Sequence, residues 1–346
     1  MNNNDYSSLV NALKGKSIAI VYTFENEDAL GFAHYHVWES RIISGWLNAV
    51  QEIKCLPFVI DVRTFVQKVI NNTLPCIDFV LNLNCGCYNL STACLVPSVC
   101  SFAAIPCIPC NAVSIITSEN KKISNHLATV MRLNVPKKLD YSCKGGIYKP
   151  VNLGSSIGVG RDDIPDVDGE IIYQEFIPGY DITIPIVFNP YINDIDLLPP
   201  IIYMPKSYDP EWIYSESEKK NDNGFEIFTL EAVEAIAKTE LINFAKEFPI
   251  ETFGRIDARL YSSENMLTTR VLDDVLRLRN LYFIEMNSMP TIENDDSFEY
   301  AFNAASATND HSFYQCINIY RQIIEKPSIN GFLLSCSMLA LSKAKY

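Results

Sequence analysis

Two stretches in the last third of the chain combine acidic side chains with a regular alternation of apolar residues. In "FGRIDARLY", the alternation places Arg255, Asp257 and Arg259 on one face of a predicted strand. In "LYFIEMNSMP", Glu285 and Asn287 likewise share one face of a second strand. If the two strands pair, an aspartate, a glutamate and an asparagine converge beside an arginine.

Such a group of oxygen donors suits Mg²⁺, which binds few protein carboxylates and takes waters and phosphate oxygens as its other ligands. The alternative is a solvated sheet face that carries a salt-bridged pair. Against this alternative, Glu285 lies in a strongly apolar strand, where an unpaired charge is costly. The neighbouring Ile284 and Met286 are expected to point away from the site.

A third stretch, "YKPVNLGSSIGVGR" at 148–161, is rich in small residues. The chain has only 14 glycines among its 346 residues, yet three of them follow Lys149 closely, together with Ser155 and Ser156. A tight surface hairpin would use small residues to permit positive φ angles. A flexible loop would instead use its backbone N–H groups and hydroxyls to close over phosphates, with Lys149 adding positive charge.

The elements that must position these groups follow an α/β order in the first hundred residues. Strands and amphipathic helices alternate there, with predicted ranges of 17–24, 36–53, 55–61, 63–72 and 77–84. This order implies a parallel sheet with helices on its faces, and ligands bind at the carboxyl ends of such strands. The segment "CGCYNLS" after the third strand is therefore a candidate wall of a site.

The pattern changes at about Ala112. We expect a helix that begins near Ser118 as its N-cap, then the strand "GGIYKP" before the Gly/Ser loop and a further strand region interrupted by the turn "IPGYD". The aperiodic segment 204–224 is long for a connection, which is typical of a lid. The apolar tract "GFLLSCSMLALSK" predicts a terminal helix that packs on the body of the protein.

The overall composition restricts the class of protein. Hydrophobic residues make up 48% and charged residues 20%, which indicates a folded chain of two or three domains. A net charge of −13 disfavours binding to nucleic acids or anionic membranes. Because the N-terminus does not resemble a signal peptide and no apolar tract is long enough to span a bilayer, we expect a cytoplasmic protein.

The cysteines raise the alternative of metal or redox chemistry, since most of the 11 lie between Cys55 and Cys110. A zinc site would need a second pair at a suitable spacing. Cys94, Cys100 and Cys107 have apolar neighbours, so we expect small buried thiols in a reducing compartment.

Taken in order, "SENKK", "YKPVNLGSSIGVGR", "YQEFIPGYDIT", "FGRIDARL" and "FIEMNSMP" resemble the motifs of the ATP-grasp superfamily, and within it those of the D-alanine–D-alanine ligase family. The resemblance is close over about 113–290 and holds only in outline before it. It implies an α/β (α+β) fold with an N-terminal parallel α/β domain (1–112), a central ATP-binding domain (113–178) and a C-terminal catalytic α+β domain (179–346) whose lid is 204–224.

The resemblance also implies cofactors and residue roles. ATP would lie between two α+β halves with two Mg²⁺ ions, which Mn²⁺ could replace. Arg255 and Ser156 would be catalytic, Arg255 by stabilising negative charge on an acyl phosphate and on the tetrahedral intermediate. The metal ligands would be Asp257, Glu285 and Asn287, with Glu285 bridging the ions. The residues that contact ATP would be Lys121, Lys149, Ser155 and Ser156 at the phosphates, Gln174, Glu175, Phe176 and Ile177 at the adenine, and Asp181 at the ribose.

The sequence departs from the family pattern where a substrate would bind. The glycine- and acid-rich His-Gly segment is replaced by "NLNCGCYNLSTA", and the Glu-Ser motif after the first strand is not evident, with Glu39 only a loose candidate. The lid contains Tyr208 and Tyr214, but its lysines, Lys219 among them, are not clearly in register. The acidic "ENDDSF" stands where the family holds a substrate carboxylate, which it would repel.

These features favour an ATP-dependent carboxylate–amine ligase that acts on another carboxylic acid with an amine or amino acid. A diverged D-alanine–D-alanine ligase is the second hypothesis. A non-catalytic ATP-binding scaffold is the third, although a scaffold has no need of a costly acidic cluster. A homodimer is left open, because family members are often dimeric.

Overall fold

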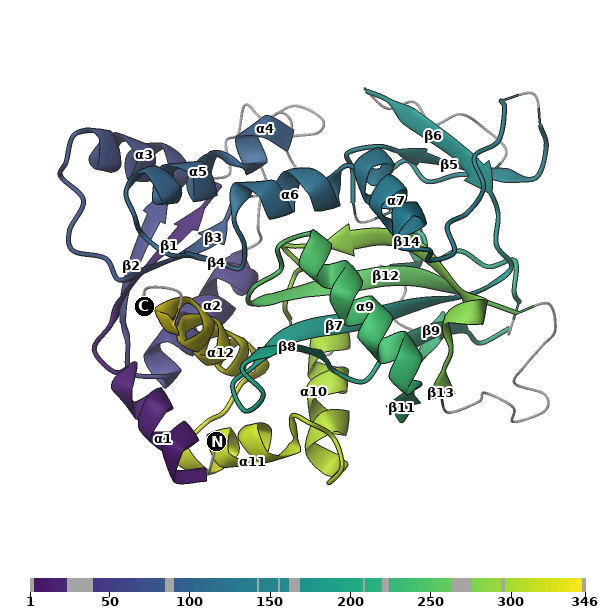
Figure 1. Cartoon of the computed structure of the whole chain (residues 1–346). Coiled ribbons are helices and arrows are strands. Elements are labelled where there is room, and N and C mark those ends of the chain that lie inside the picture. The colour runs from purple at the N-terminus through teal and green to yellow at the C-terminus, as the bar shows by residue number, and fades with distance from the viewer. Residues whose placement is uncertain are drawn as a thin grey trace.

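The computed structural model describes the chain at residues 3–23, 40–84, 90–141, 143–154, 156–161, 169–207, 209–219, 224–262, 275–293 and 296–343. The predicted α/β fold class is confirmed: a parallel sheet and a larger antiparallel sheet lie side by side with helices packed around them (Figure 1). No helix within these ranges combines the length and apolar character that a bilayer span requires.

The parallel sheet has the order β2-β1-β3-β4. Its strands are β1 (Ser17–Tyr22), β2 (Leu56–Asp61), β3 (Phe79–Leu83) and β4 (Cys107–Ile108). The helices around it are α1 (Asn3–Ala12), α2 (Ser40–Glu52), α3 (Val62–Ile70), α4 (Leu90–Ala93) and α5 (Leu95–Phe102). Alternate residues of β1 pack on opposite sides: Ile18 and Ile20 in the core with α2, and Ala19 and Val21 in the core with α3 and α5. Burial on both faces explains the continuous apolar runs in the sequence.

The antiparallel sheet has the order β10-β9-β7-β12-β14, with β8 paired to β7. Its strands are β7 (Gly179–Asn189), β8 (Asp194–Leu197), β9 (Ile201–Pro205), β10 (Phe225–Thr229), β12 (Phe253–Tyr261) and β14 (Leu281–Asn287). One face packs on α9 (Ala235–Glu247), and the other on α10 (Ser297–Ala307) and α12 (Ile329–Lys343). The terminal helix α12 also contacts α2, so it packs on the body as predicted.

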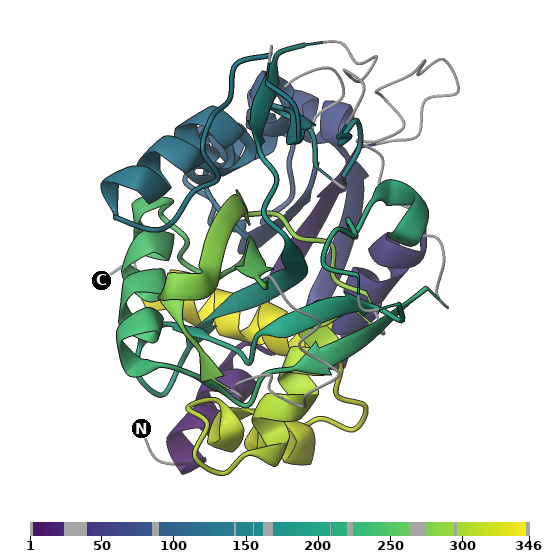
Figure 2. The same cartoon turned by 90° about the vertical axis from the view of Figure 1, so that its right-hand side faces the viewer.

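A third, two-stranded sheet pairs β5 (Gly146–Pro150) with β6 (Ile171–Glu175) in antiparallel fashion. It lies above the β12–β14 edge of the large sheet in both views (Figures 1 and 2). The Gly/Ser loop belongs to the connection 151–170 between these strands, which is far too long for a tight hairpin turn.

The helical region before this sheet differs from the prediction at its cap. The structure has two helices, α6 (Ala112–Glu119) and α7 (Lys121–Val130), where we expected one that begins at Ser118. The N-cap of α7 is Asn120, whose side chain accepts hydrogen bonds from the N–H groups of Lys122 and Ile123 and whose backbone is extended. Ser118 instead lies in the last turn of α6, and its hydroxyl donates to Ser288 Oγ at 2.8 Å.

The predicted lid connects β9 to β10 and contains the short helix α8 (Glu216–Lys219). The other elements are β11 (Ala232–Val233), β13 (Val275–Leu276), a 3₁₀ turn at Leu278–Asn280 and α11 (Tyr314–Ile323). Among the cysteines, Cys94 and Cys100 are buried as predicted, whereas Cys107 is only half-buried, and the described residues contain no cluster of three His, Cys, Asp or Glu side chains that could hold a metal. The predictions for Glu39, Tyr208 and most of "CGCYNLS" lie outside the described residues.

Candidate active site

The two strands that carry the predicted metal ligands pair directly. In the antiparallel register of β12 with β14, Asp257 lies opposite Glu285 and Arg255 opposite Asn287. The register shifts immediately after Asp257, because Ala258 pairs with Phe283 and leaves Ile284 as an extra residue. This bulge overturns one expectation: Ile284 does not point away, but lines the same cavity as Glu285.

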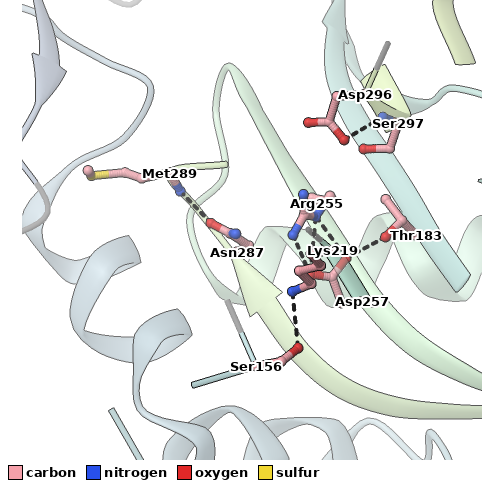
Figure 3. A network of polar contacts seen from close by, with 9 residues as sticks. All are labelled: Ser156, Thr183, Lys219, Arg255, Asp257, Asn287, Met289, Asp296 and Ser297. Carbon is pink, nitrogen blue, oxygen red and sulfur yellow. Dashed lines mark hydrogen bonds and ion pairs between the residues drawn. The ribbon is translucent and has the colours of Figure 1, made fainter. Parts of the chain in front are cut away.

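Asp257 is held by two neighbours on the sheet face (Figure 3). Arg255 donates to it in bidentate fashion, from Nε to Oδ1 at 2.8 Å and from Nη2 to Oδ2 at 2.8 Å. Thr183 Oγ1 on β7 donates to Oδ1, also at 2.8 Å. Burial raises the pKa of Asp257 above its ordinary value, against the opposing effect of Arg255. The carboxylate is thereby oriented by groups on two adjacent strands.

Glu285 has a different environment, because it faces the lysines. Lys121 Nζ, at the first turn of α7, lies 2.7 Å from Glu285 Oε2 and also donates to the carbonyl of Leu153 in the Gly/Ser loop. Burial favours the protonated carboxyl, but Lys121, Lys219 and Arg255 outweigh it and hold the pKa of Glu285 below its ordinary value. The glutamate therefore stays ionised at neutral pH.

A cavity of about 90 Å³, partly open to solvent, is lined by residues of the β5–β6 sheet and of the β12–β14 edge. Eight of the residues predicted from the sequence line it: Lys121, Lys149, Ser156, Glu175, Phe176, Ile177, Asp181 and Glu285. Gln174 is not in the lining, since its side chain donates to the carbonyl of Pro136, and Ser155 lies outside the described residues.

The Gly/Ser loop touches the lid at one end of this cavity. Ser156 has a positive φ of 63°, and its hydroxyl donates to the carbonyl of Tyr214 at 2.9 Å. Lys219 of α8 reaches back to Ser156 Oγ at 3.0 Å (Figure 3). The lid lysine that the sequence did not place in register is thus brought into the site by the fold, and burial together with Arg255 lowers its pKa.

Comparison with known proteins bears on the fold. No protein-family model matches the sequence, and no curated protein is detectably similar to it. Solved structures do match. A D-alanine–D-alanine ligase from Bacillus anthracis has a TM-score of 0.57 at 16% identity, and the alignment covers 88% of this chain and 97% of that one. A complex of that enzyme with ATP has a TM-score of 0.56 at 15% identity, covering 88% of this chain and 97% of that chain.

Two further matches extend this result to other organisms. The VanG D-Ala:D-Ser ligase from Enterococcus faecalis gives a TM-score of 0.58 at 14% identity, over 89% of this chain and 100% of that chain. The D-alanyl-alanine synthetase A from Vibrio cholerae gives 0.56 at 13% identity, over 88% and 98%. The chain has the ATP-grasp fold of D-alanine–D-alanine ligases. At these identities the likeness establishes the fold alone.

Within this ATP-grasp fold, the donor set can be tested against the expected metal. Asp257 and Glu285 supply hard carboxylate oxygens on adjacent strands, the ligand type that Mg²⁺ prefers. Asn287 Oδ1 already accepts a hydrogen bond from the N–H of Met289 at 3.1 Å, which leaves one further lone pair on that oxygen (Figure 3). Each carboxylate is now paired with a cation, so metal binding would have to displace or share Arg255 and Lys121. The residues fit the metal in chemical type.

The site also contains a carboxylate that the sequence analysis did not identify. Glu119, the last residue of α6, is half-buried and near both Glu285 and Asp257. Burial and repulsion from Glu285 raise its pKa from 4.5 to about 7, although Lys121 and Arg255 oppose this. Its position two residues before Lys121 in "SENKK" was the available signal.

Lys149 leads to a prediction on pH. Burial, with repulsion from Lys121, lowers its pKa from 10.5 to about 8. Because the neutral amine cannot attract phosphate, we expect the affinity for Mg-ATP to fall up to about tenfold between pH 7 and 9.5, the value of one charge-assisted contact. Titration calorimetry across this range measures the change.

The matched control is Lys149→Arg, which keeps its charge and should flatten the profile. A loss of protein stability caused by the titration of Lys149 cannot explain weaker binding of Mg-ATP at high pH. Burial of the charged amine lowers the free energy of unfolding at a pH below about 8, the pKa of Lys149 in the folded protein. This cost is relieved as the pH rises from about 8 towards 10.5, so the titration of Lys149 makes the protein more stable in that range. An equal decline in the arginine variant would contradict the assignment.

Proposed function

We propose that the protein is an ATP-dependent carboxylate–amine ligase that forms an amide bond through an acyl phosphate. The observation that carries the proposal is the pairing of Asp257 with Glu285, which lines a cavity together with Lys121 and Lys149. Phosphoryl transfer needs this combination of acidic metal ligands and cations, since it depends on positioning and charge neutralisation more than on a covalent nucleophile.

In the proposed reaction, a carboxylate oxygen of the acid substrate takes the γ-phosphoryl group of ATP, and ADP leaves. The amine then attacks the acyl carbon, inorganic phosphate leaves with the bonding electrons, and the nitrogen loses a proton. Mg²⁺ held by Asp257, Glu285 and Asn287 would neutralise charge on the phosphate oxygens.

The chain's own cations complete this arrangement. Lys121 and Lys149 would bind the phosphates, and Ser156 would fix the Gly/Ser loop over them through Lys219. Arg255, anchored by Asp257, would stabilise the negative charge that develops at the acyl centre. The lid would exclude water, which protects an acyl phosphate from hydrolysis.

The acidic segment after β14 argues against the substrates of the structural neighbours. A substrate with a free carboxylate needs a cation or a hydrogen-bond donor near it, and this segment carries negative charge. Asp296 is the N-cap of α10, and its carboxylate acts electrostatically on Arg255 and Tyr203. A helix N-terminus without such an acid would attract a carboxylate, and Asp296 opposes that attraction. We therefore propose an acid–amine pair other than two D-alanines.

The test is phosphate release from Mg-ATP by purified protein, screened against D-alanine and pooled carboxylic acids, each with and without an amine. We expect release with an acid–amine pair other than D-alanine alone, and none from the Asp257→Asn variant. Release driven by D-alanine alone would support a diverged D-alanine–D-alanine ligase. ATP binding without turnover across the screen would instead indicate a non-catalytic scaffold.

A further inference from the structure

Arg259 lines the cavity and makes several hydrogen bonds, but the proposed reaction does not use it. It lies on β12, two residues after Asp257, and is only 4% exposed. Its guanidinium donates from Nε to the carbonyl of Ile177 at 3.0 Å and from Nη1 to Asp181 Oδ2 at 2.7 Å. A buried guanidinium is stable only where its donors are satisfied and its charge is paired, so these contacts are structurally necessary.

The third nitrogen of the guanidinium bonds the lid. Arg259 Nη2 donates to the carbonyl of Pro210 at 3.2 Å and to the carbonyl of Trp212. We call residues 209–214 the lid root, because they lead from β9 to α8. One side chain therefore joins three segments that are distant in the sequence: the metal-bearing strand, the stretch expected to contact adenine, and the lid root.

Two hydrogen bonds from backbone N–H groups also connect the lid root with residues 179–181. The N–H of Tyr214 donates to Asp181 Oδ2 at 3.1 Å, the oxygen that Arg259 also contacts. The N–H of Gly179 donates to the carbonyl of Pro210 at 2.8 Å. Because Asp181 bonds both Arg259 and the lid root, the ion pair fixes the position of Tyr214 from two sides.

The position of Tyr214 in turn determines what the lid presents to the Gly/Ser loop. Its carbonyl accepts the hydroxyl of Ser156, and its ring lies under Lys219 Nζ at 5.2 Å. The same ring stacks on Tyr203 of β9 with centroids 4.5 Å apart. Lys219 and Ser156 therefore meet only if the lid root is in the place that Arg259 and Asp181 define.

We propose that Arg259 is a positioning residue that docks the lid root onto the strand region 177–181, and so aligns Lys219 with the Gly/Ser loop. The docking itself does not depend on the proposed ligase activity. Its consequence for catalysis does rest on the proposed function.

The direct test is hydrogen exchange of the Tyr214 and Gly179 amides without ligand, because these N–H groups make the docking bonds. Arg259→Met keeps an unbranched apolar stem and removes the guanidinium with its charge and its N–H donors. We expect at least about tenfold faster exchange at both amides, which corresponds to the loss of about 1.4 kcal/mol of local protection. Arg259→Lys, which keeps the ion pair but cannot reach both carbonyl groups at once, should show a smaller increase.

Arg279→Met is the matched control, since Arg279 is exposed on the 3₁₀ turn, and it should leave both amides unchanged. Amide hydrogen exchange in strands β1 and β3 and the midpoint of urea denaturation show whether a variant has lost stability as a whole. Unchanged exchange at Tyr214 in a folded Arg259→Met or Arg259→Lys protein would overturn the proposal. If Arg259→Met does not fold, the comparison of Arg259→Lys with wild type decides it.

Turnover provides the second readout. In a ligase, Arg259→Met should lower kcat and raise the KM for ATP, whereas the KM for the acid substrate should change little, because only the lid and the nucleotide side of the cavity are disturbed. A wild-type protein that turns over no ATP would contradict the proposed function, while the exchange measurement would still decide the docking role of Arg259.

Discussion

Replacing Glu285 with glutamine is expected to lower ATP-dependent phosphate release by about three orders of magnitude, or ~4 kcal/mol in the activation barrier. The variant keeps the volume of the side chain and removes the charge that faces Lys121 at 2.7 Å. Phosphate release under saturating Mg-ATP measures the loss. A second readout is the binding of Mn²⁺ followed by electron paramagnetic resonance, which reports the metal site without turnover.

The matched control is Glu247→Gln, because Glu247 is exposed at the end of α9 and does not line the cavity. It should leave activity and Mn²⁺ binding unchanged. Removing Glu285 also leaves the buried Lys121 without its ion-pair partner, so the urea midpoint must be measured for both variants. A folded Glu285→Gln protein with wild-type turnover and Mn²⁺ affinity would refute the metal-ligand role.

The second large effect concerns Gly179, the first residue of β7. A Cβ atom there would lie 2.0 Å from the carbonyl oxygen of Leu260 and 2.8 Å from the N–H nitrogen of Ser262, and the residue has a φ of 134°. Neither backbone atom can move without separating β7 from β12, which pair at this point. We expect Gly179→Ala to lower the free energy of unfolding by more than about 3 kcal/mol, measured by urea denaturation.

Gly169→Ala separates the clash from the conformational strain. Gly169 also has a positive φ, of 110°, but no atom of the described residues lies within 4 Å of the place that a Cβ atom would take there. Its substitution should therefore cost only about 1 kcal/mol. If Gly179→Ala proved no more destabilising than this control, the close approach of β7 and β12 at the start of the strand would be wrong.

Several parts of the fold were predictable because they depend on local patterns. The runs "SIAIVYTF" and "IDFVLNLN" predicted β1 and β3, since a strand buried on both faces must be apolar throughout. The alternation in "FGRIDARLY" and "LYFIEMNSMP" predicted the strands β12 and β14, and their pairing is confirmed. The ATP-grasp fold was predicted from the order of the short motifs and is confirmed by the structural matches.

Other features escaped prediction. The helix cap was assigned to Ser118, but the extended backbone at Asn120 divides the region into α6 and α7. Ile284 was expected to point away, but a bulge in the pairing with β12 turns it towards the cavity. The cap at Asn120 had a local signal, since asparagine is a preferred N-cap residue, whereas the bulge at Ile284 depends on the strand that the segment pairs with.

The sequence by itself determined the residue types of the site. These are two carboxylates and an asparagine on two strands with alternating apolar residues, and a lysine before a Gly/Ser loop. Only the tertiary structure decided which further charges join them. Glu119, Lys219 and Arg259 come from a helix end, a lid and the far end of a strand. Packing brings Arg259 into the lining of the cavity, Lys219 to Ser156 and Glu119 near Glu285. The physical reason is that a charge is tolerated in a buried site only beside its partners, and those partners are assembled by long-range folding, not by sequence spacing.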